Sequence, residues 1–407
     1  MSIPVVSGIA TFARAVWNKL RGRPTVQADR GAIAAGENQT ISAPVATGGG
    51  VVATGQATVV AGPSGGPTII VQSGGTLNLV SYVDGLPQAK DPALRAAFEE
   101  GRRLQDEGYE AQNAHKHREA IDRFTRALEL AENDSQRAAL RILRGNSYAS
   151  ISEYGEAEAD YQETLKLGKN ISPTEDAAQA RAAALGNLGT VYADRGELDK
   201  AEEHHKQALE IDRETGNRLG EAADLNNLGT VYSRRGDLDI GEEHHKKALE
   251  IAREIGDREG EAITLGNLGV DYLQRGDLDK AEEHLKQALG IQRDIGDRLG
   301  EARQLSNLGG VYHHRGDLEK AEEHVKEALD IQREIGNRLN QADALANLGI
   351  VYRNRGQPKE ARDHLQQAQA IYQEIGAGGP NVEIVRQALE ELERRQQERG
   401  EKQHPEG

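Results

Sequence analysis

The sequence LGNLGVDYLQRGDLDKAEEHLKQALGIQRDIGDRLGEA, from Leu265 to Ala302, decides the fold of this chain. Closely similar stretches precede and follow it at intervals of forty residues. The triplet Asn-Leu-Gly marks each copy, and its asparagine stands at Asn187, Asn227, Asn267, Asn307 and Asn347. A constant period of this length indicates a stack of similar supersecondary units, each of which buries its apolar face against its neighbours.

The composition of the 407-residue chain fits a thin stack better than one large core, because only 37% of the residues are hydrophobic. Cysteine is absent, which excludes disulfides and thiolate metal sites. The net charge is −16, and residues 91–407 are the acidic part, so we expect no nucleic-acid partner. The sequence contains no run of eighteen apolar residues, so we expect no membrane-spanning helix. Arg14 interrupts the apolar stretch that a signal peptide would need, so we expect a cytoplasmic protein.

Each copy predicts two antiparallel helices joined by a short turn. In the repeat that begins at residue 182, the recurring residues are Leu185, Leu188, Gly189, Tyr192, Gly196, Ala201, His205, Ala208 and Leu209. Small residues at positions 8, 20 and 27 let the helices approach closely, and large residues fill the space between them. This pattern resembles the tetratricopeptide repeat. The resemblance implies a mainly α, right-handed solenoid of about seven repeats, beginning near residues 97, 138, 182, 222, 262, 302 and 342.

The forty-residue spacing with asparagine at position 6 resembles the kinesin-light-chain-like branch of this family and the helical arrays of bacterial peptide-sensing regulators. The resemblance covers residues 95–378 and leaves residues 1–90 unrecognised. A glycine ends the second helix of a repeat, as at Gly216, where a left-handed residue is needed. A residue such as Asn217 then caps the next first helix.

The asparagine column is the predicted binding site. A carboxamide both donates and accepts hydrogen bonds, so it can pair with the backbone of an extended peptide, and the resemblance implies this role in the concave groove. Arg303, His313 and Arg353 add positive charge toward the later repeats, which predicts a partner segment with acidic residues at one end. In the alternative interpretation, each asparagine bonds a neighbouring helix and is part of the repeat itself.

Catalytic and metal-binding motifs are missing from the sequence, which contains no G-x-x-x-x-G-K-[ST], H-E-x-x-H or G-x-S-x-G. We therefore expect no enzymatic activity, no cofactor and no metal site. The arginine column that includes Arg195 is explained by the favourable field at a helix C-terminus. The histidine column that includes His204 and carboxylates such as Glu202 are predicted to be solvated outer-face residues.

Residues 1–25 predict an amphipathic helix over Val5–Arg21. Its polar face is basic. A membrane surface, a partner groove and the protein's own body all remain possible contacts for its apolar face. The residues expected to dock are Val5, Ile9, Phe12, Val16, Trp17 and Leu20, with Arg14 and Lys19 on the polar face.

Residues 26–90 contain an uncharged stretch, Asn38–Val83, in which short Val/Ile/Thr runs alternate with Gly-rich turns. Such runs predict strands, and low charge favours pairing between chains. The expected strands are Gln39–Ser42, Val51–Thr54, Ala57–Ala61, Thr68–Gln72 and Thr76–Tyr82. An oligomerisation segment, a flexible linker and membrane-inserting strands are the three interpretations.

The chain is thus predicted to have four regions: 1–25, 26–90, the array at 91–378, and a capping helix with a polar tail at 379–407. The leading hypothesis is a non-enzymatic scaffold that binds a peptide or protein segment, with residues 1–90 driving self-assembly into a homo-oligomer or tethering to a membrane. The alternatives are a membrane-perturbing effector restrained by the array, and a structural filament or shell protein.

Overall fold

The computed structural model describes residues 92–113, 116–131, 133–170 and 175–403, together with short strands between residues 39 and 80. The predicted helix Val5–Arg21 and its docking residues lie outside the described residues. The chain divides between Asn267 and Leu268 into two compact units, which are here called the N-terminal and C-terminal bodies.

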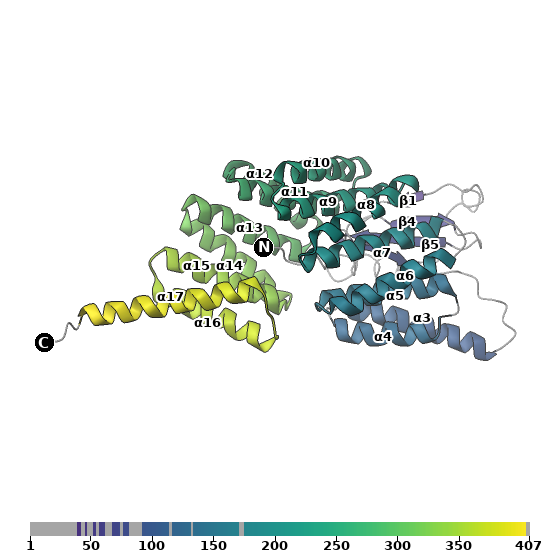
Figure 1. The fold of residues 1–407 in the computed structure, drawn as a ribbon, viewed down its shortest axis with the longest axis horizontal. Coiled ribbons are helices and arrows are strands. Elements are labelled where there is room, and N and C mark those ends of the chain that lie inside the picture. Colours follow the sequence, from purple (N-terminus) through teal and green to yellow (C-terminus); the bar gives the residue numbers. More distant parts are fainter. Residues whose placement is uncertain are drawn as a thin grey trace. The chain divides into compact units, whose positions relative to one another are not determined.

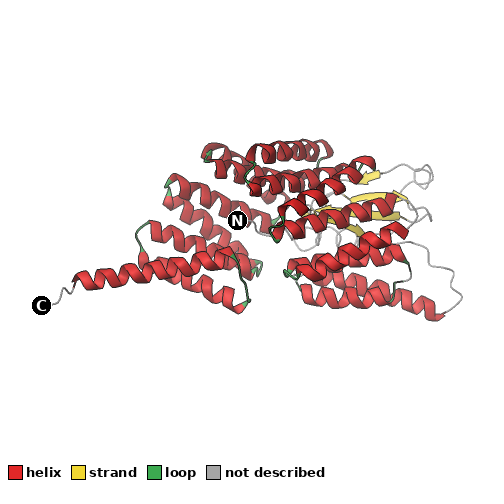
Figure 2. Ribbon diagram, viewed as in Figure 1, coloured by secondary structure: helices red, strands yellow, loops and turns green. Residues whose placement is uncertain are grey.

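Fifteen helices occupy the described part of the chain after residue 91, as seven successive pairs and a final helix (Figures 1 and 2). The N-terminal body holds α3 (Pro92–Asn113), α4 (His117–Glu129), α5 (Asp134–Ser150), α6 (Tyr154–Asn170), α7 (Glu175–Asp194), α8 (Leu198–Glu214), α9 (Arg218–Arg235) and α10 (Leu238–Ile255). The division lies inside α11 (Arg258–Arg275). The C-terminal body continues with α12 (Leu278–Ile295), α13 (Arg298–Arg315), α14 (Leu318–Glu334), α15 (Arg338–Asn354), α16 (Pro358–Glu374) and α17 (Pro380–Gln403). The predicted array of helix pairs is confirmed.

One packing rule joins the two helices of every repeat. The glycine at position 8 of the first helix leaves room for the side chain at position 24 of the second, as a Cβ at Gly189 would lie 2.7 Å from the His205 ring. The pairs are Gly108–Phe124, Gly145–Tyr161, Gly189–His205, Gly229–His245, Gly269–Leu285, Gly309–Val325 and Gly349–Leu365. The predicted close approach is therefore confirmed. In the first repeat this pairing sets position 1 at residue 101, so the predicted start near residue 97 was wrong by one helical turn.

The turns between repeats follow the predicted capping pattern. Gly216 has a φ of 68°, a left-handed conformation that glycine adopts without strain. The next residue, Asn217, accepts a hydrogen bond from the Gly220 N–H at 3.2 Å and so caps α9. Asp297 does the same for α13 through the Gly300 N–H at 2.9 Å. These local signals set where each first helix begins.

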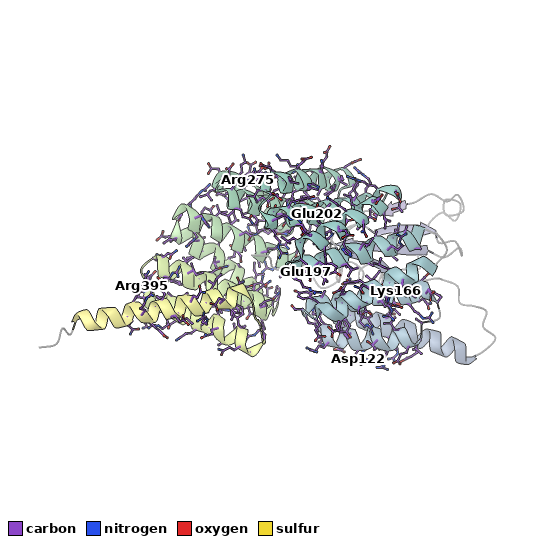
Figure 3. The ribbon with its side chains drawn as sticks, viewed as in Figure 1. Asp122, Lys166, Glu197, Glu202, Arg275 and Arg395 are labelled. Atoms are coloured by element: carbon purple, nitrogen blue, oxygen red, sulfur yellow. The ribbon has the colours of Figure 1, made fainter. Side chains whose placement is uncertain are left out.

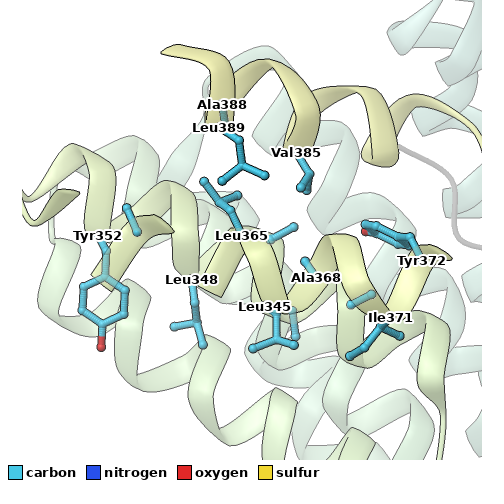
Figure 4. Packing of buried hydrophobic residues seen from close by; sticks show 14 of the residues in the cluster. Leu345, Leu348, Tyr352, Leu365, Ala368, Ile371, Tyr372, Val385, Ala388 and Leu389 are labelled. Carbon is cyan, nitrogen blue, oxygen red and sulfur yellow. The ribbon is translucent and has the colours of Figure 1, made fainter. Parts of the chain in front are cut away.

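The last helix, α17, packs on the end of the C-terminal body. Val385, Leu389 and Leu392 are buried, and they pack on the cluster that contains Leu365 and Tyr372 of α16 (Figure 4). Burial of a leucine side chain contributes roughly 1.5–3 kcal/mol. The apolar stripe thus covers the face that an eighth repeat would otherwise occupy.

Six short strands precede the helices within the described residues: β1 (Gln39–Ile41), β2 (Val45–Ala46), β3 (Val52–Ala53), β4 (Ala57–Ala61), β5 (Pro67–Ser73) and β6 (Thr76–Val80). An antiparallel sheet has the order β1-β4-β5-β6, with Val59 opposite Ile69 and Ile70 opposite Leu79, and β2 pairs with β3. The five predicted strand ranges each overlap an observed strand, whereas no range was predicted for the two-residue β2.

Candidate peptide-binding surface

The asparagine column lies on the first helices of five successive repeats, α7, α9, α11, α13 and α15. Its members differ in burial. Asn187 is 4% exposed, Asn227, Asn267 and Asn307 are half-buried, and Asn347 is exposed. Identical residues in the repeat pattern therefore have different surroundings.

Two members of the column are tied to neighbouring helices. The Asn187 Nδ2 donates to Asn146 Oδ1 at 2.9 Å, and the Tyr161 hydroxyl donates to the same oxygen at 2.7 Å. The Asn267 Nδ2 donates to Asn226 Oδ1 at 3.0 Å. For these two positions the structural interpretation holds, because their amide groups are used inside the array.

The other three members keep hydrogen-bonding capacity. The Asn227 Nδ2 is shielded from solvent and has no acceptor among the described residues. The Asn307 Nδ2 lies 3.4 Å from Gln304 Oε1, a long contact. Asn347 presents its carboxamide to solvent. A peptide backbone could use the amides of Asn307 and Asn347 without breaking the packing, whereas the Asn227 nitrogen is closed to solvent.

The positive charge predicted beside the column is partly neutralised. Arg353 pairs with Glu391 of α17, with a distance of 3.1 Å between Nη1 and the carboxylate. The pKa of His313 is lowered by burial and by the neighbouring His314 and Arg353, so its ring is neutral near pH 7. Arg303 is half-buried on α13. The pull on an acidic partner is therefore weaker than the sequence alone predicts.

Sequence reasoning missed a recurring clamp between successive repeats. In the N-terminal body, Glu202 of α8 (Figure 3) accepts hydrogen bonds from the Tyr232 hydroxyl at 2.7 Å and from Arg235 at 2.6 Å, both on α9. Lys206 reaches the same carboxylate at 2.5 Å. The matching acceptors are Glu158, Glu282 and Glu322. The expectation that Glu202 is merely solvated was wrong, and the arginine column serves this clamp as well as the helix end.

The clamp fixes the charge of its carboxylate. Burial alone would raise the pKa of Glu202, but hydrogen bonds from Lys206, Tyr232 and Arg235 outweigh it and lower the pKa to about 2. The pKa of Glu282 falls to about 2 for the same reason. The constant columns of tyrosine, arginine and glutamate were the sequence signal for this contact.

The histidine column has a structural explanation. His204 stacks on the Tyr192 ring, with centroids 5.0 Å apart, and its Nδ1 lies 2.8 Å from the Lys200 carbonyl oxygen. The same arrangement recurs at His244, His284, His324 and His364. Within the described residues, no three His, Asp or Glu side chains gather as metal ligands would. Nor does any helix in that part of the chain have the length and apolar content of a membrane span.

Seven helix pairs built on one packing rule define a helical-repeat protein. Tetratricopeptide-repeat sequences match residues 106–170, 180–240, 225–294 and 301–374, which together exceed half of the chain. The chain belongs to the tetratricopeptide-repeat family. The heat shock protein STI1 of Saccharomyces cerevisiae is 29% identical over 106 residues, which are 26% of this chain and only 16% of that protein.

Several solved structures are similar. Aspartyl phosphate phosphatase F of Bacillus subtilis has a TM-score of 0.58 at 15% identity, covering 72% of this chain and 76% of its own. A Rap protein complexed with Competence and Sporulation Factor has a TM-score of 0.53 at 17% identity, covering 73% and 87%. A putative kinesin light chain of Podospora anserina with nearly identical repeats has a TM-score of 0.40 at 20% identity, covering 48% and 96%. At identities this low, the first two structures, with TM-scores above 0.5, show a shared fold alone.

Proposed function

We propose that this protein is a non-enzymatic scaffold whose first helices bind an extended peptide or protein segment. Tetratricopeptide arrays are generally protein-interaction scaffolds, and the Rap protein of similar fold was solved with a bound factor. The observation that carries the proposal is the unused hydrogen-bonding capacity of Asn307 and Asn347, both in the C-terminal body.

The expected mode is recognition of the partner's backbone. A carboxamide offers one acceptor and two donors, which match a peptide C=O and N–H without regard to side chains. Because Arg353 already pairs with Glu391, acidic residues in the partner would add steering more than affinity. Arg303 and His313 stay predicted contacts for the partner, His313 through hydrogen bonding because its ring is neutral near pH 7.

A peptide library displayed on phage and selected on the full chain tests the proposal. Selected peptides should bind the Asn307→Ala, Asn347→Ala double variant at least about tenfold more weakly, because each lost amide contact costs about 1 kcal/mol. Gln287→Ala is the matched control, since Gln287 is an exposed amide on a second helix. Equal affinity for the double variant and the wild type would refute the proposal, as would the absence of any selected peptide.

The N-terminal region is proposed to assemble copies of the chain or to tether them to a membrane. The order of the four-stranded sheet leaves β1 and β6 as its edges, and edge strands can pair with another chain. Asn38–Val83 carries no charged residue that would oppose such pairing. The amphipathic pattern of Val5–Arg21 supports tethering.

Solution mass and liposome flotation of the full chain separate these roles. A large oligomer that ignores liposomes supports self-assembly or a structural shell, and flotation without leakage supports tethering. Release of an encapsulated dye at low protein concentration would favour the membrane-perturbing effector. A monomer that neither floats nor releases dye would contradict the proposal for residues 1–90.

A further inference from the structure

Two aspartates meet inside the junction between the third and fourth repeats. Asp212, on α8, is 3% exposed, and Asp224, on α9, is 5% exposed. Asp212 Oδ2 lies against Gly220, one helical turn before Asp224 on α9, so the two buried carboxyl groups are near enough to influence each other's pKa. The glycine at position 220 is what makes this possible, because a Cβ there would lie 1.9 Å from Asp212 Oδ2.

The donors around these carboxyl groups are too few for two charges. Asp212 Oδ1 accepts a hydrogen bond from the Asn217 Nδ2 at 2.9 Å. The Oδ2 of Asp224 is buried and receives no donor from the described residues. A buried carboxylate oxygen without a donor, set against a second carboxylate, is satisfied when one proton is shared between the two groups.

The charged groups nearby do not neutralise the pair. On α9, Glu221 is engaged by Arg213 of α8 at 2.9 Å and by Arg218 at 2.5 Å. His205, on α8, has its Nδ1 3.6 Å from Asp224 Oδ1, too far for a hydrogen bond. Burial lowers the pKa of His205 to about 4, so its ring is neutral near pH 7.

The helices on either side contribute no compensating charge to the pair. On α7, Gly186 faces the pair, and a Cβ there would lie 3.3 Å from Asp224 Oδ1. From α10, the buried titratable group is His245, whose Nδ1 contacts Asn226 Oδ1 at 3.2 Å. Burial, followed by the influence of His244, lowers the pKa of His245 to about 3, so this ring is also uncharged.

The same two positions are neutral at every other junction of this kind. They hold Ala252 and Thr264 between α10 and α11, Gln292 and Gln304 between α12 and α13, and Gln332 and Ala344 between α14 and α15. The carboxyl pair is therefore particular to the α8–α9 junction, and the glutamine pair provides a natural control of similar size.

We propose that the packing of α8 against α9, here called the joint, depends on a proton. When the two helices pack together, the joint is closed, and Asp212 and Asp224 share one proton taken up from solvent. Raising the pH removes this proton and separates the helices, which opens the joint. The inference does not depend on what the array binds. Because Asp224 is followed closely by Asn226 and Asn227, opening the joint moves the part of α9 that carries the asparagine column.

The direction of the effect follows from the two carboxyl groups. The two carboxyl groups titrate as one pair: burial, followed by the neighbouring Asp224, raises to about 8 the pKa at which Asp212 gives up the shared proton. The ordinary aspartate pKa is near 3.9. The open joint therefore releases a proton that the closed joint holds. The closed state is favoured at low pH, and this preference is lost as the pH rises toward 8.

Hydrogen exchange of the full chain, followed by mass spectrometry from pH 6 to pH 8, tests the proposal. After correction for intrinsic exchange, opening of peptides from α8 and α9 should increase by about tenfold per pH unit, the value for release of one proton. Peptides from α12 and α13 serve as the internal control, and their opening should stay constant over this range.

Two sets of variants assign the proton. Asp212→Gln with Asp224→Gln copies the α12–α13 junction and should remove the pH dependence, as should Asp212→Asn alone. His205→Gln should leave it in place, and its loss in that variant would show that the histidine holds the proton. If the wild-type α8–α9 and α12–α13 peptides respond equally to pH, the proposal is wrong, and this result needs no variant to fold.

Discussion

Repeats 3 and 4 and repeats 5 to 7 use one backbone plan with different interiors. At position 24, the earlier repeats bury His205 and His245, whereas the later ones bury Leu285, Val325 and Leu365. The surrounding clamps and caps hardly change. The difference shows that the repeat pattern specifies the shape of the core and leaves its polarity open: the earlier repeats bury a titratable group at position 24, and the later ones bury an aliphatic group there.

The largest expected effect comes from the apolar interior. Leu285→Ala should lower the free energy of unfolding by about 2–5 kcal/mol, because a fully buried leucine is replaced by a cavity. Urea unfolding measures this loss. Ile240→Ala is the control: Ile240 is 43% exposed on α10 and should change stability by less than about 0.5 kcal/mol. A loss below 1 kcal/mol at Leu285 would mean that the later repeats are not held by apolar packing.

The next largest effect is expected when the buried histidine of an earlier repeat is replaced by the leucine of a later one. The ordinary histidine pKa is near 6.5 and that of buried His205 is about 4, so the unfolded chain takes up a proton that the folded chain excludes. The resulting stability is present above pH 6.5 and is lost as the pH falls to about 4, a change of roughly 3 kcal/mol.

His205→Leu should therefore reduce the amount by which the free energy of unfolding falls between pH 7 and pH 4.5. Denaturant unfolding at these two pH values measures the difference. The reciprocal change, Leu285→His, should increase this difference. If both variants keep the wild-type pH profile, position 24 does not set the proton dependence of the repeats.

The smallest effect concerns the clamp, which both sets of repeats share. Glu202→Gln should cost roughly 1–2 kcal/mol, since the amide cannot accept the charge-assisted hydrogen bonds of Arg235 and Lys206. Glu203→Gln, on the exposed side of the same helix, should change stability by less than about 0.5 kcal/mol. Thermal unfolding compares the two. Equal stabilities for these two variants would mean that the clamp contributes no more to stability than an ordinary surface ion pair.

Much of the fold was predictable because it follows from local chemistry. The left-handed Gly216, the cap at Asn217 and the small residue at Gly189 each require only their own repeat. The period then extends these features along the chain. The first repeat was misplaced because it lacks the Asn-Leu-Gly triplet that marks the later repeats, although Gly108 and Phe124 keep the packing register.

The contacts between repeats could not be derived in the same way. Glu202 meets Tyr232 thirty residues later, and that offset depends on how one repeat stacks on the next. The candidate site shows the same limit. The period identified the asparagine column, but the burial of Asn187 against Asn146 appears only once the helices are placed.

The glycine opposite position 24 has a consequence for how such a chain can change over time. Because Gly145, Gly189 and Gly269 each leave space, the facing position holds a phenol ring, an imidazole or an aliphatic group on the same backbone plan. A duplicated repeat can thus change the polarity of its core by one substitution at position 24, which is buried and leaves the exposed residues of the repeat unaltered. Duplication then copies the exposed residues, and position 24 lets the core of each copy hold a titratable or an aliphatic group.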